Sequence, residues 1–409
     1  MGRIMRSPLF LMALTIFIDF TGFGLVIPLL PFWAQHLGAN PFEVGLILTI
    51  YALAQFLFTP VLGSLSDRYG RRPIILASLA IEALAFALTA LAPNLLFLLL
   101  ARFIGGLGAS NIGSAQAVVS DVTPPHERAK GMGAIGAAIG LGFVVGPALG
   151  GILAPLGAAL PFWVAMGVAL LNALLVFFLL PETHKSHERT MRKGGPILLI
   201  SGWQKAVRYP VVVRLVLINF LFTVAFSAME AIFPLFAQAK FHWGATQNGY
   251  AFTYVGFIVV IMQGGLVGRL VKRFGERSLL IAGLALLALG LALLAISSSL
   301  ALLLIALGVL SIGDGAVTPT SSALLSFSTP GDAQGELLGL SQGAGGLARV
   351  LGPMAAGSLF LIGGASAPFI SAALLTLVAL AIALPRLPKA PPQLQQPTEE
   401  LVEVEALSR

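Results

Sequence analysis

Twelve long apolar runs, separated by short polar turns, constrain this chain more than any other feature of its sequence. Each run has about 20 mostly apolar residues, the length that an α-helix needs to cross a bilayer. Inside hydrocarbon a spanning segment must satisfy its own backbone hydrogen bonds, which favours helices. The sequence therefore predicts an all-α polytopic membrane protein with twelve transmembrane helices. The expected spans are residues 8–33, 44–66, 73–92, 95–120, 130–153, 160–181, 211–238, 246–268, 279–297, 300–323, 336–361 and 367–385.

Composition excludes the main soluble classes. Charged residues make up 10% of the chain and hydrophobic residues 57%, whereas soluble globular domains carry about 25% charged residues. The chain has no cysteine, which removes disulfides and thiolate metal sites. None of its five histidines lies within an expected span, and no serine–histidine–aspartate grouping or phosphate-binding loop is present. We therefore predict no enzyme, no catalytic residue and no metal site.

The basic residues predict the orientation of the chain. If the N-terminus is cytoplasmic, all of the 24 lysines and arginines except Arg102, Lys240 and Arg349 lie on or near the cytoplasmic side. This asymmetry matches the excess of positive charge in cytoplasmic loops of membrane proteins. Because the charges are spread over many loops, they predict contact with the lipid bilayer and not with nucleic acid. We expect an integral protein of the plasma (inner) membrane with both termini cytoplasmic.

The two halves of the chain repeat each other at an offset of about 206 residues. The sequence GSLSDRYGRR at 63–72 returns as GRLVKRFGER at 268–277. Duplicated six-helix halves of equal orientation are typical of transporters that rock about a site between the halves. The predicted divisions are an N-terminal half (1–181), a cytoplasmic linker (182–210), a C-terminal half (211–385) and a disordered cytoplasmic tail (386–409).

The first repeated motif lies between the second and third spans. Its glycines allow a tight turn, Asp67 can sit against a helix N-terminus whose dipole favours an anion, and its arginines can pair with neighbouring helix ends or lipid phosphates. In the second copy Lys272 replaces the aspartate, which predicts an asymmetric role. The alternative is a basic loop that serves topology alone. The residues of the motif are Gly63, Asp67, Arg68, Gly70, Arg71 and Arg72.

The fifth span carries a second motif of small residues and proline. Small residues let helices approach closely, and glycine with proline permits a bend. Ordinary tight packing of a glycine-rich helix is the alternative interpretation. The motif consists of Gly142, Gly146, Pro147, Gly150 and Gly151.

Six charged residues lie inside expected spans, where such groups are costly and are functional hypotheses by default. Asp19 can be a structural polar contact instead, and Arg102 can reach toward the membrane surface. Glu82 can be a structural acid that faces protein. At 1.5 Å per residue, Asp314 and Arg349 lie at similar depth and are predicted to pair or to share a polar network. The six are Asp19, Glu82, Arg102, Glu230, Asp314 and Arg349.

Together these motifs resemble the major facilitator superfamily over essentially the whole chain, in the drug:proton antiporter branch that includes the tetracycline and multidrug exporters. The resemblance implies that the loop motif latches the halves in the outward-open state. It also implies that the fifth-span motif marks an exporter that exchanges substrate for protons. Arg102, followed by Gly106 and Gly108, resembles the family motif whose arginine assists proton transfer. Asp19, ahead of Gly24 and Pro28, resembles the first helix of these antiporters.

The resemblance further implies that the first, fourth, seventh and tenth helices line a central cavity. We therefore expect a secondary active transporter, a proton-coupled antiporter that exports amphipathic drugs or similar small molecules by alternating access. It is expected to act as a monomer, with the proton gradient as energy source and no cofactor. The third-helix acid of the tetracycline exporters aligns with Ala85, which argues against a magnesium–tetracycline substrate.

Two alternatives stay open. One is an exporter or facilitator of a metabolite such as a sugar or an amino acid. The other is a receptor or scaffold of the membrane that transports nothing.

Overall fold

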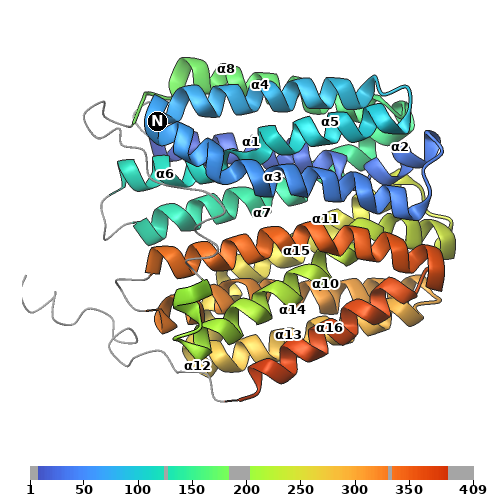
Figure 1. Cartoon of the computed structure of the whole chain (residues 1–409). Helices are drawn as coiled ribbons and strands as arrows, with labels where there is room; N and C mark the ends of the chain where they lie inside the picture. Colours follow the sequence, from blue (N-terminus) through green and yellow to red (C-terminus); the bar gives the residue numbers. More distant parts are fainter. Residues whose placement is uncertain (1–7, 124–127, 184–202, 330–333, 386–409) are drawn as a thin grey trace, which may run out of the picture.

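The computed structural model describes residues 8–123, 128–183, 203–329 and 334–385. The helices run back and forth along one common axis (Figure 1). Eleven helical segments of the described chain are long and apolar enough to cross a membrane, and Ala367–Ala383 is a shorter apolar helix. This confirms the predicted all-α protein with twelve spanning helices. Most of the predicted linker and the whole tail from 386 lie outside the described residues.

The first six spans are built from eight α-helices and two 3-10 turns, one inside the fourth span and one, η3 (Ala154–Leu156), at the end of the fifth. Two spans depart from a single straight helix, because the first ends before Pro28 and resumes as a short helix, and the fourth changes to 3-10 geometry in its middle. The elements are α1 (Pro8–Val26), α2 (Leu30–His36), α3 (Pro41–Tyr69), α4 (Arg71–Ala90), α5 (Leu95–Gly108), η1 (Ala109–Asn111), α6 (Ile112–Val122), α7 (Arg128–Leu153) and α8 (Leu160–Leu179).

The last six spans repeat this arrangement. The eighth span contains a π-helical turn, so that α11, η5 and α12 together form one membrane crossing. The elements are α10 (Pro210–Phe241), α11 (Ala245–Ile261), η5 (Met262–Leu266), α12 (Val267–Phe274), α13 (Glu276–Ile296), α14 (Leu300–Ser328), α15 (Gln334–Gly363) and α16 (Ala367–Ala383).

Basic side chains gather at one end of the helix bundle, which we call the basic end. It holds the start of α1, the turns that follow α3 and α12, and the ends of α8 and α16. The other end, where α2 lies, we call the opposite end (Figure 1). The described arginines and lysines of the two loop motifs at the basic end are Arg68, Arg71, Arg72, Arg269, Lys272, Arg273 and Arg277.

The helices of the first six spans lie on one side of the molecule and those of the last six on the other (Figure 1). Two pairs of long helices join the sides: α3 packs along α15, and α7 packs along α11. Within each side, α7 also packs along α1, and α15 along α10. The contacts between the two sides therefore run through α7 and α15, which are equivalent helices of the repeat.

Candidate functional site

Glycines at the middle of the fourth span bring three helices close together. A Cβ atom at Gly108 would lie 2.8 Å from the backbone nitrogen of Glu82, and one at Gly106 would overlap the backbone oxygen of Tyr51. Only glycine allows α5 to lie this close to both α3 and α4. The chain then turns through η1, which points Asn111 into the same interior.

Asp19 and Glu82 meet in that interior. The two carboxyl groups lie within hydrogen-bonding reach of each other, and Asp19 also reaches the side chain of Asn111. One turn farther along each helix, Gly22 faces Phe86, whose ring would be 3.7 Å from an added Cβ. Glu82 is 4% exposed, and one oxygen of each carboxyl is buried without a hydrogen-bond partner. A hydrogen bond between two carboxyls requires a proton on one of them.

Arg102 lies beside this carboxyl pair. It is 2% exposed, its guanidinium carbon is 4.6 Å from the centre of the Tyr51 ring, and Glu82 is within electrostatic range. Phe23 stacks on the same tyrosine, with ring centres 5.4 Å apart. The structure therefore places Arg102 in the protein interior and not at a membrane surface.

We call Asp19, Tyr51, Glu82, Arg102 and Asn111 the first-half cluster. Three of its members were predicted from the sequence, and Tyr51 and Asn111 were not. A polar side chain three residues beyond Gly108, in an otherwise apolar span, was the available signal for Asn111. Tyr51 carried no comparable signal, because an aromatic residue in a spanning helix is ordinary.

A second group of charges, the second-half cluster, is formed by Glu230, Asp314 and Arg349. Glu230 in α10 is within electrostatic range of both Arg349 in α15 and Asp314 in α14. The side chain of Arg349 is accessible although it lies deep in the bundle, while Asp314 is 8% exposed. An accessible side chain at this depth faces the region between the two sides of the molecule.

The predicted partnership of Asp314 and Arg349 takes a different form in the structure. The charged neighbour of Arg349 is Glu230, and Asp314 is not among the groups that act on it. Glu230 is within electrostatic range of each. The two residues share a network through Glu230.

The loop motif forms a compact charge cluster at the basic end. Gly70, with φ of +108°, is the single residue between α3 and α4. Arg71 pairs with Asp67, at 2.5 Å, and with Asp121 at the end of α6, at 3.3 Å. Asp67 lies in the last turn of α3 and is not the residue that meets the N-terminus of α4, the next helix. Its partner is the arginine four residues on.

The anion at that helix N-terminus is Glu182, which the sequence analysis did not single out. Its carboxylate accepts hydrogen bonds from the backbone N–H groups of Arg71 (2.9 Å) and Arg72 (3.2 Å). The first N–H groups of a helix lack partners inside it and carry partial positive charge, so a carboxylate there is stabilising. Arg72 in turn donates to the carbonyl of Phe177 in α8.

The remaining residues of the loop motif have fewer close neighbours. Arg68 is exposed and lies over the ring of Tyr69, 5.1 Å from its centre, and a Cβ at Gly63 would meet no atom within 4 Å. In the second copy, Gly275 has φ of +79° and Arg277 donates to the carbonyl of Leu384 at 2.8 Å. The backbone of the turn is thus repeated. The aspartate-centred charge pairs of the first copy have no counterpart around Lys272 among the described residues.

The glycines of the fifth-span motif face two different helices. Gly142, Gly146 and Gly150 lie against the backbone of α1, where added Cβ atoms would come within 3 Å of it. Pro147 and Gly151 lie against Gly249 of α11, on the other side of the molecule. The motif therefore supports close packing of α7 both within its own half and across the interface.

The two sides touch at the opposite end and through the middle of the bundle. Thr49 in α3 donates to the carbonyl of Val350 in α15 at 2.9 Å. Nearer the opposite end, a Cβ at Gly45 would overlap the backbone of Pro353, and one at Gly357 would overlap that of Pro41. These contacts hold α3 and α15 together at this end.

Toward the basic end several glycines of these spans face no neighbouring atom. Added methyl groups at Gly133 in α7, Gly268 in α12 or Gly339 in α15 would meet no atom within 4 Å. Gly63 in α3 is equally free. The described contacts between the sides therefore concentrate at the opposite end and in the middle of the bundle.

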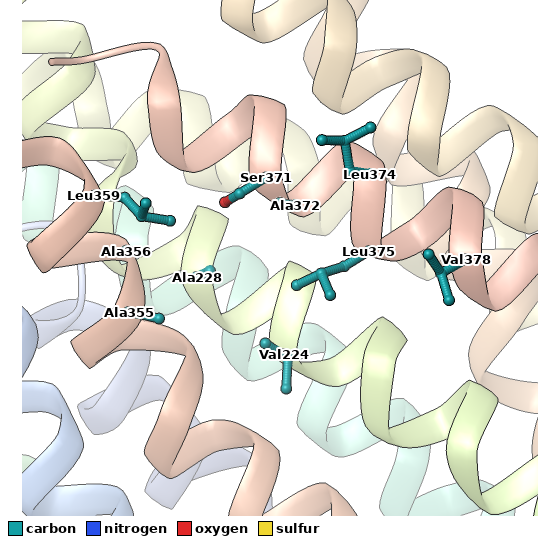
Figure 2. Close-up of a pocket in the computed structure, with 10 residues that line it drawn as sticks. All are labelled: Val224, Ala228, Ala355, Ala356, Leu359, Ser371, Ala372, Leu374, Leu375 and Val378. Carbon is teal, nitrogen blue, oxygen red and sulfur yellow. The ribbon is translucent and has the colours of Figure 1, made fainter. Parts of the chain in front are cut away.

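A pocket lies away from the charges. It has a volume of about 320 Å³ and is formed by α10, α15 and α16 (Figure 2). Ser371 is the one polar side chain among its ten lining residues, and Leu374 and Val378 at its mouth are 58% and 50% exposed. An apolar groove on the outer surface of a spanning bundle is suited to lipid chains. Within the described ranges no three histidine or acidic side chains gather to hold a metal ion.

Comparisons with known proteins agree with this architecture. The sequence model of the Major Facilitator Superfamily matches residues 12–273 and 264–408. The class C tetracycline resistance protein of Escherichia coli is 33% identical over 345 residues, which cover 83% of this chain and 86% of that protein. The quinolone resistance protein NorA of Staphylococcus aureus is 28% identical over 357 residues, 87% of this chain and 90% of that protein.

Solved structures show the same fold. The human organic anion transporter MFSD10 (TETRAN) superposes with a TM-score of 0.72 at 28% identity, covering 93% of this chain and 99% of that one. The nucleoside transporter NupG gives a TM-score of 0.77 at 11% identity, covering 93% and 100%. These relatives confirm a transporter and not an enzyme, and they favour neither a metabolite carrier nor a scaffold. The chain belongs to the Major Facilitator Superfamily, as a secondary active transporter.

Proposed function

We propose that this protein is a proton-coupled antiporter that exports amphipathic aromatic drugs. The observation that carries the proposal is the contact between Asp19 and Glu82, two carboxyl groups in the interior of a membrane protein. Two carboxylates at this distance repel each other, whereas a singly protonated pair forms a hydrogen bond. The pair can therefore bind and release one proton, which is what a proton carrier requires.

The cation of Arg102 limits the charge of this site. With one proton on the pair, one carboxylate faces one guanidinium and the cluster is neutral. Loss of the proton leaves a net negative charge in a low-dielectric interior, which is costly unless water or a cationic group reaches it. Proton binding thus favours the state in which the cluster is sealed, and proton loss favours the state in which it is open.

We assign the basic end to the cytoplasm, because loops rich in lysine and arginine face that side. In this orientation the contacts between the sides at Gly45, Thr49 and Gly357 lie in the outer half of the bundle, which supports an inward-facing state that would take up a substrate for export. Residues 1–181 and 211–385 would rock as two units about the contacts of α7 and α15. Both termini would be cytoplasmic, in the plasma membrane. A monomer suffices, since both charge clusters lie within one chain, and the proton gradient replaces a cofactor.

The substrate class follows from the surroundings of the two clusters. Phe20 and Phe23 of α1 lie against Phe143 of α7, with ring centres 5.6 and 6.1 Å apart, and Phe23 reaches Tyr51. Aromatic surfaces with a few charged groups suit flat amphipathic molecules. The accessible Arg349 and its neighbour Glu230 would supply the polar contacts. Relatives named for tetracycline and quinolone resistance support a drug of this kind.

Proteoliposomes test the proposal. The purified protein is reconstituted, a proton gradient is imposed, and transport of ethidium, an aromatic cation, is followed by fluorescence. We expect saturable transport against the ethidium gradient that a protonophore abolishes. Equal transport with and without the proton gradient would contradict the coupling.

A further inference from the structure

Tyr51 lies near charged side chains from both halves of the chain. It lies in α3, is 8% exposed, and has Asp19, Glu82, Arg102 and Arg349 within electrostatic range. These four groups lie on α1, α4, α5 and α15, respectively. They are the charged and titratable side chains that act on the tyrosine. Three belong to the first half of the chain and one to the second.

The ring of Tyr51 is the contact that fixes Arg102. The guanidinium lies over the ring at 4.6 Å, a distance at which a cation is attracted by the face of an aromatic system. Among the described residues, Arg102 has no ion pair within 4.0 Å, and its Nε is buried without a hydrogen-bond partner. Glu82 acts on Arg102 only from a greater distance.

The ring itself is held in place from three sides. Phe23 stacks on it with an angle of 24° between the ring planes. A Cβ at Gly105 would lie 3.5 Å from its edge, so α5 closes against it. The backbone of Tyr51 is in turn pressed against Gly106. A ring confined in this way can hold a buried cation in one position.

We propose that Tyr51 is a positioning residue that keeps Arg102 near Glu82 but out of direct contact with it. This inference rests on the proton-carrying role proposed for Asp19 and Glu82. A direct ion pair would hold Glu82 as a carboxylate and would compete with its hydrogen bond to Asp19. With the cation on the ring, the carboxyl pair can accept a proton at a higher pH than it could beside a bound arginine.

Two substitutions of Tyr51 distinguish the role of its aromatic ring from that of its hydroxyl group. Tyr51→Phe keeps the aromatic face and should leave Arg102 in place. Tyr51→Leu removes the face, and the guanidinium should then move onto Glu82, its nearest anion. Tyr254 in α11 provides a matched control, because it is a half-exposed tyrosine of a spanning helix whose hydroxyl meets only the carbonyl of Leu304. Tyr254→Leu should change nothing at the carboxyl pair.

The decisive readout is the infrared stretching band of protonated carboxyl groups, titrated with pH in purified full-length protein. The part of the band that Glu82→Gln removes is assigned to the pair. Tyr51→Leu should move the midpoint of that part to lower pH by about one unit, while Tyr51→Phe and Tyr254→Leu stay at the wild-type midpoint. If Tyr51→Leu does not fold, Tyr51→Met serves as the second ring-free variant with the same expectation.

The proposal is overturned if the ring-free variant titrates like the wild type, or if Tyr51→Phe shifts the midpoint as far as Tyr51→Leu. The titration needs neither substrate nor transport, so it is independent of the proposed export. Absence of proton-driven ethidium transport by the wild type, with the expected midpoint shift present, would reject the transport proposal and leave the role of Tyr51 standing.

Discussion

The first-half and second-half clusters each contain two acids and one arginine, but these charged groups are arranged differently. In the first half the acids touch each other and the arginine is buried over a ring. In the second half one acid is within electrostatic range of the other acid and of an arginine that is accessible. The first cluster is therefore suited to hold a proton away from water, and the second to meet a molecule that enters between the halves.

The repeat of the chain makes this difference informative. Gly108 and Gly313 occupy equivalent positions, and added Cβ atoms there would meet the backbone nitrogens of Glu82 (2.8 Å) and Leu287 (2.6 Å). The close helix contact is thus present in both halves, but the residue that meets the glycine is an acid, Glu82, only in the first half and is Leu287 in the second. The backbone arrangement is duplicated and the charges are not. The asymmetry of the charges, and not that of the fold, distinguishes the roles of the two halves.

The largest effect is expected from Asp19→Asn. The amide cannot bind or release a proton, so the pair with Glu82 loses its coupling function. We expect proton-driven ethidium transport to fall to the level seen without a gradient, while the protein is still inserted and folded. Transport rates in proteoliposomes, with membrane yield and thermal unfolding as controls, measure this. If the Asp19→Asn variant transported ethidium at the wild-type rate, the first-half cluster would carry no proton.

Gly108→Ala and Gly313→Ala test whether the packing is truly duplicated. Each added methyl group meets a helix backbone at less than 3 Å, and overpacking of this kind costs about 1–3 kcal/mol. We expect both variants to lose similar stability in thermal unfolding of purified protein. Gly167→Ala in α8 is the control, because its methyl group meets no atom within 4 Å. A loss confined to one of the two positions would contradict equal packing in the halves.

Arg349→Leu tests the second-half cluster. Ethidium is a cation, so removal of the accessible arginine should relieve repulsion and leave Glu230 free to meet it, which should tighten binding by about 1.4 kcal/mol, a roughly tenfold fall in KM. Transport at saturating substrate should still depend on the proton gradient, because the carboxyl pair is intact. The measurement is ethidium transport as a function of concentration, with and without a protonophore. An uncoupled variant would place the proton site in the second half.

A smaller effect is expected from Asp67→Asn in the loop motif. The substitution removes one ion pair of Arg71 and leaves the pair with Asp121, so the cluster should weaken without losing its fold. The pair is largely buried, with side chains 9% and 22% exposed, but the amide oxygen of asparagine can still accept from Arg71, so we expect a loss of about 1 kcal/mol, which corresponds to a rate change of about fivefold. Lys272→Gln, at the equivalent position of the second copy, should have no effect. Equal effects at both positions would contradict an asymmetric role.

The sequence predicted the fold in detail because hydrocarbon imposes simple rules. Runs of apolar residues mark the spans, and their ends agree with the helices to within a few residues at most ends. The interruption at Pro28 and the 3-10 turn at Asn111 were not predicted, since both depend on packing against neighbouring helices. The equivalence of Gly70 and Gly275 was readable, because tight turns need glycine wherever φ is positive.

The charged residues of the candidate site could be predicted one by one, but the contacts among them could not. Rare charges in spans identify functional candidates, and six were found that way. Which charges meet depends on helix rotation, which the sequence does not reveal. Glu82 was therefore not recognised as the partner of Asp19, and the network expected for Asp314 and Arg349 did not include Glu230, the acid that acts on both. Glu182, outside the recognised motif, was missed because its role comes from a contact across 111 residues of sequence.

Substrate-induced proton release tests the central claim most directly. Ethidium is added to purified protein in weakly buffered detergent solution, and the pH of the solution is recorded. We predict that the wild type releases protons on binding, that Asp19→Asn and Glu82→Gln release none, and that Glu230→Gln still releases them at saturating ethidium. Undiminished release by both first-half variants, or its loss in Glu230→Gln alone, would contradict the account.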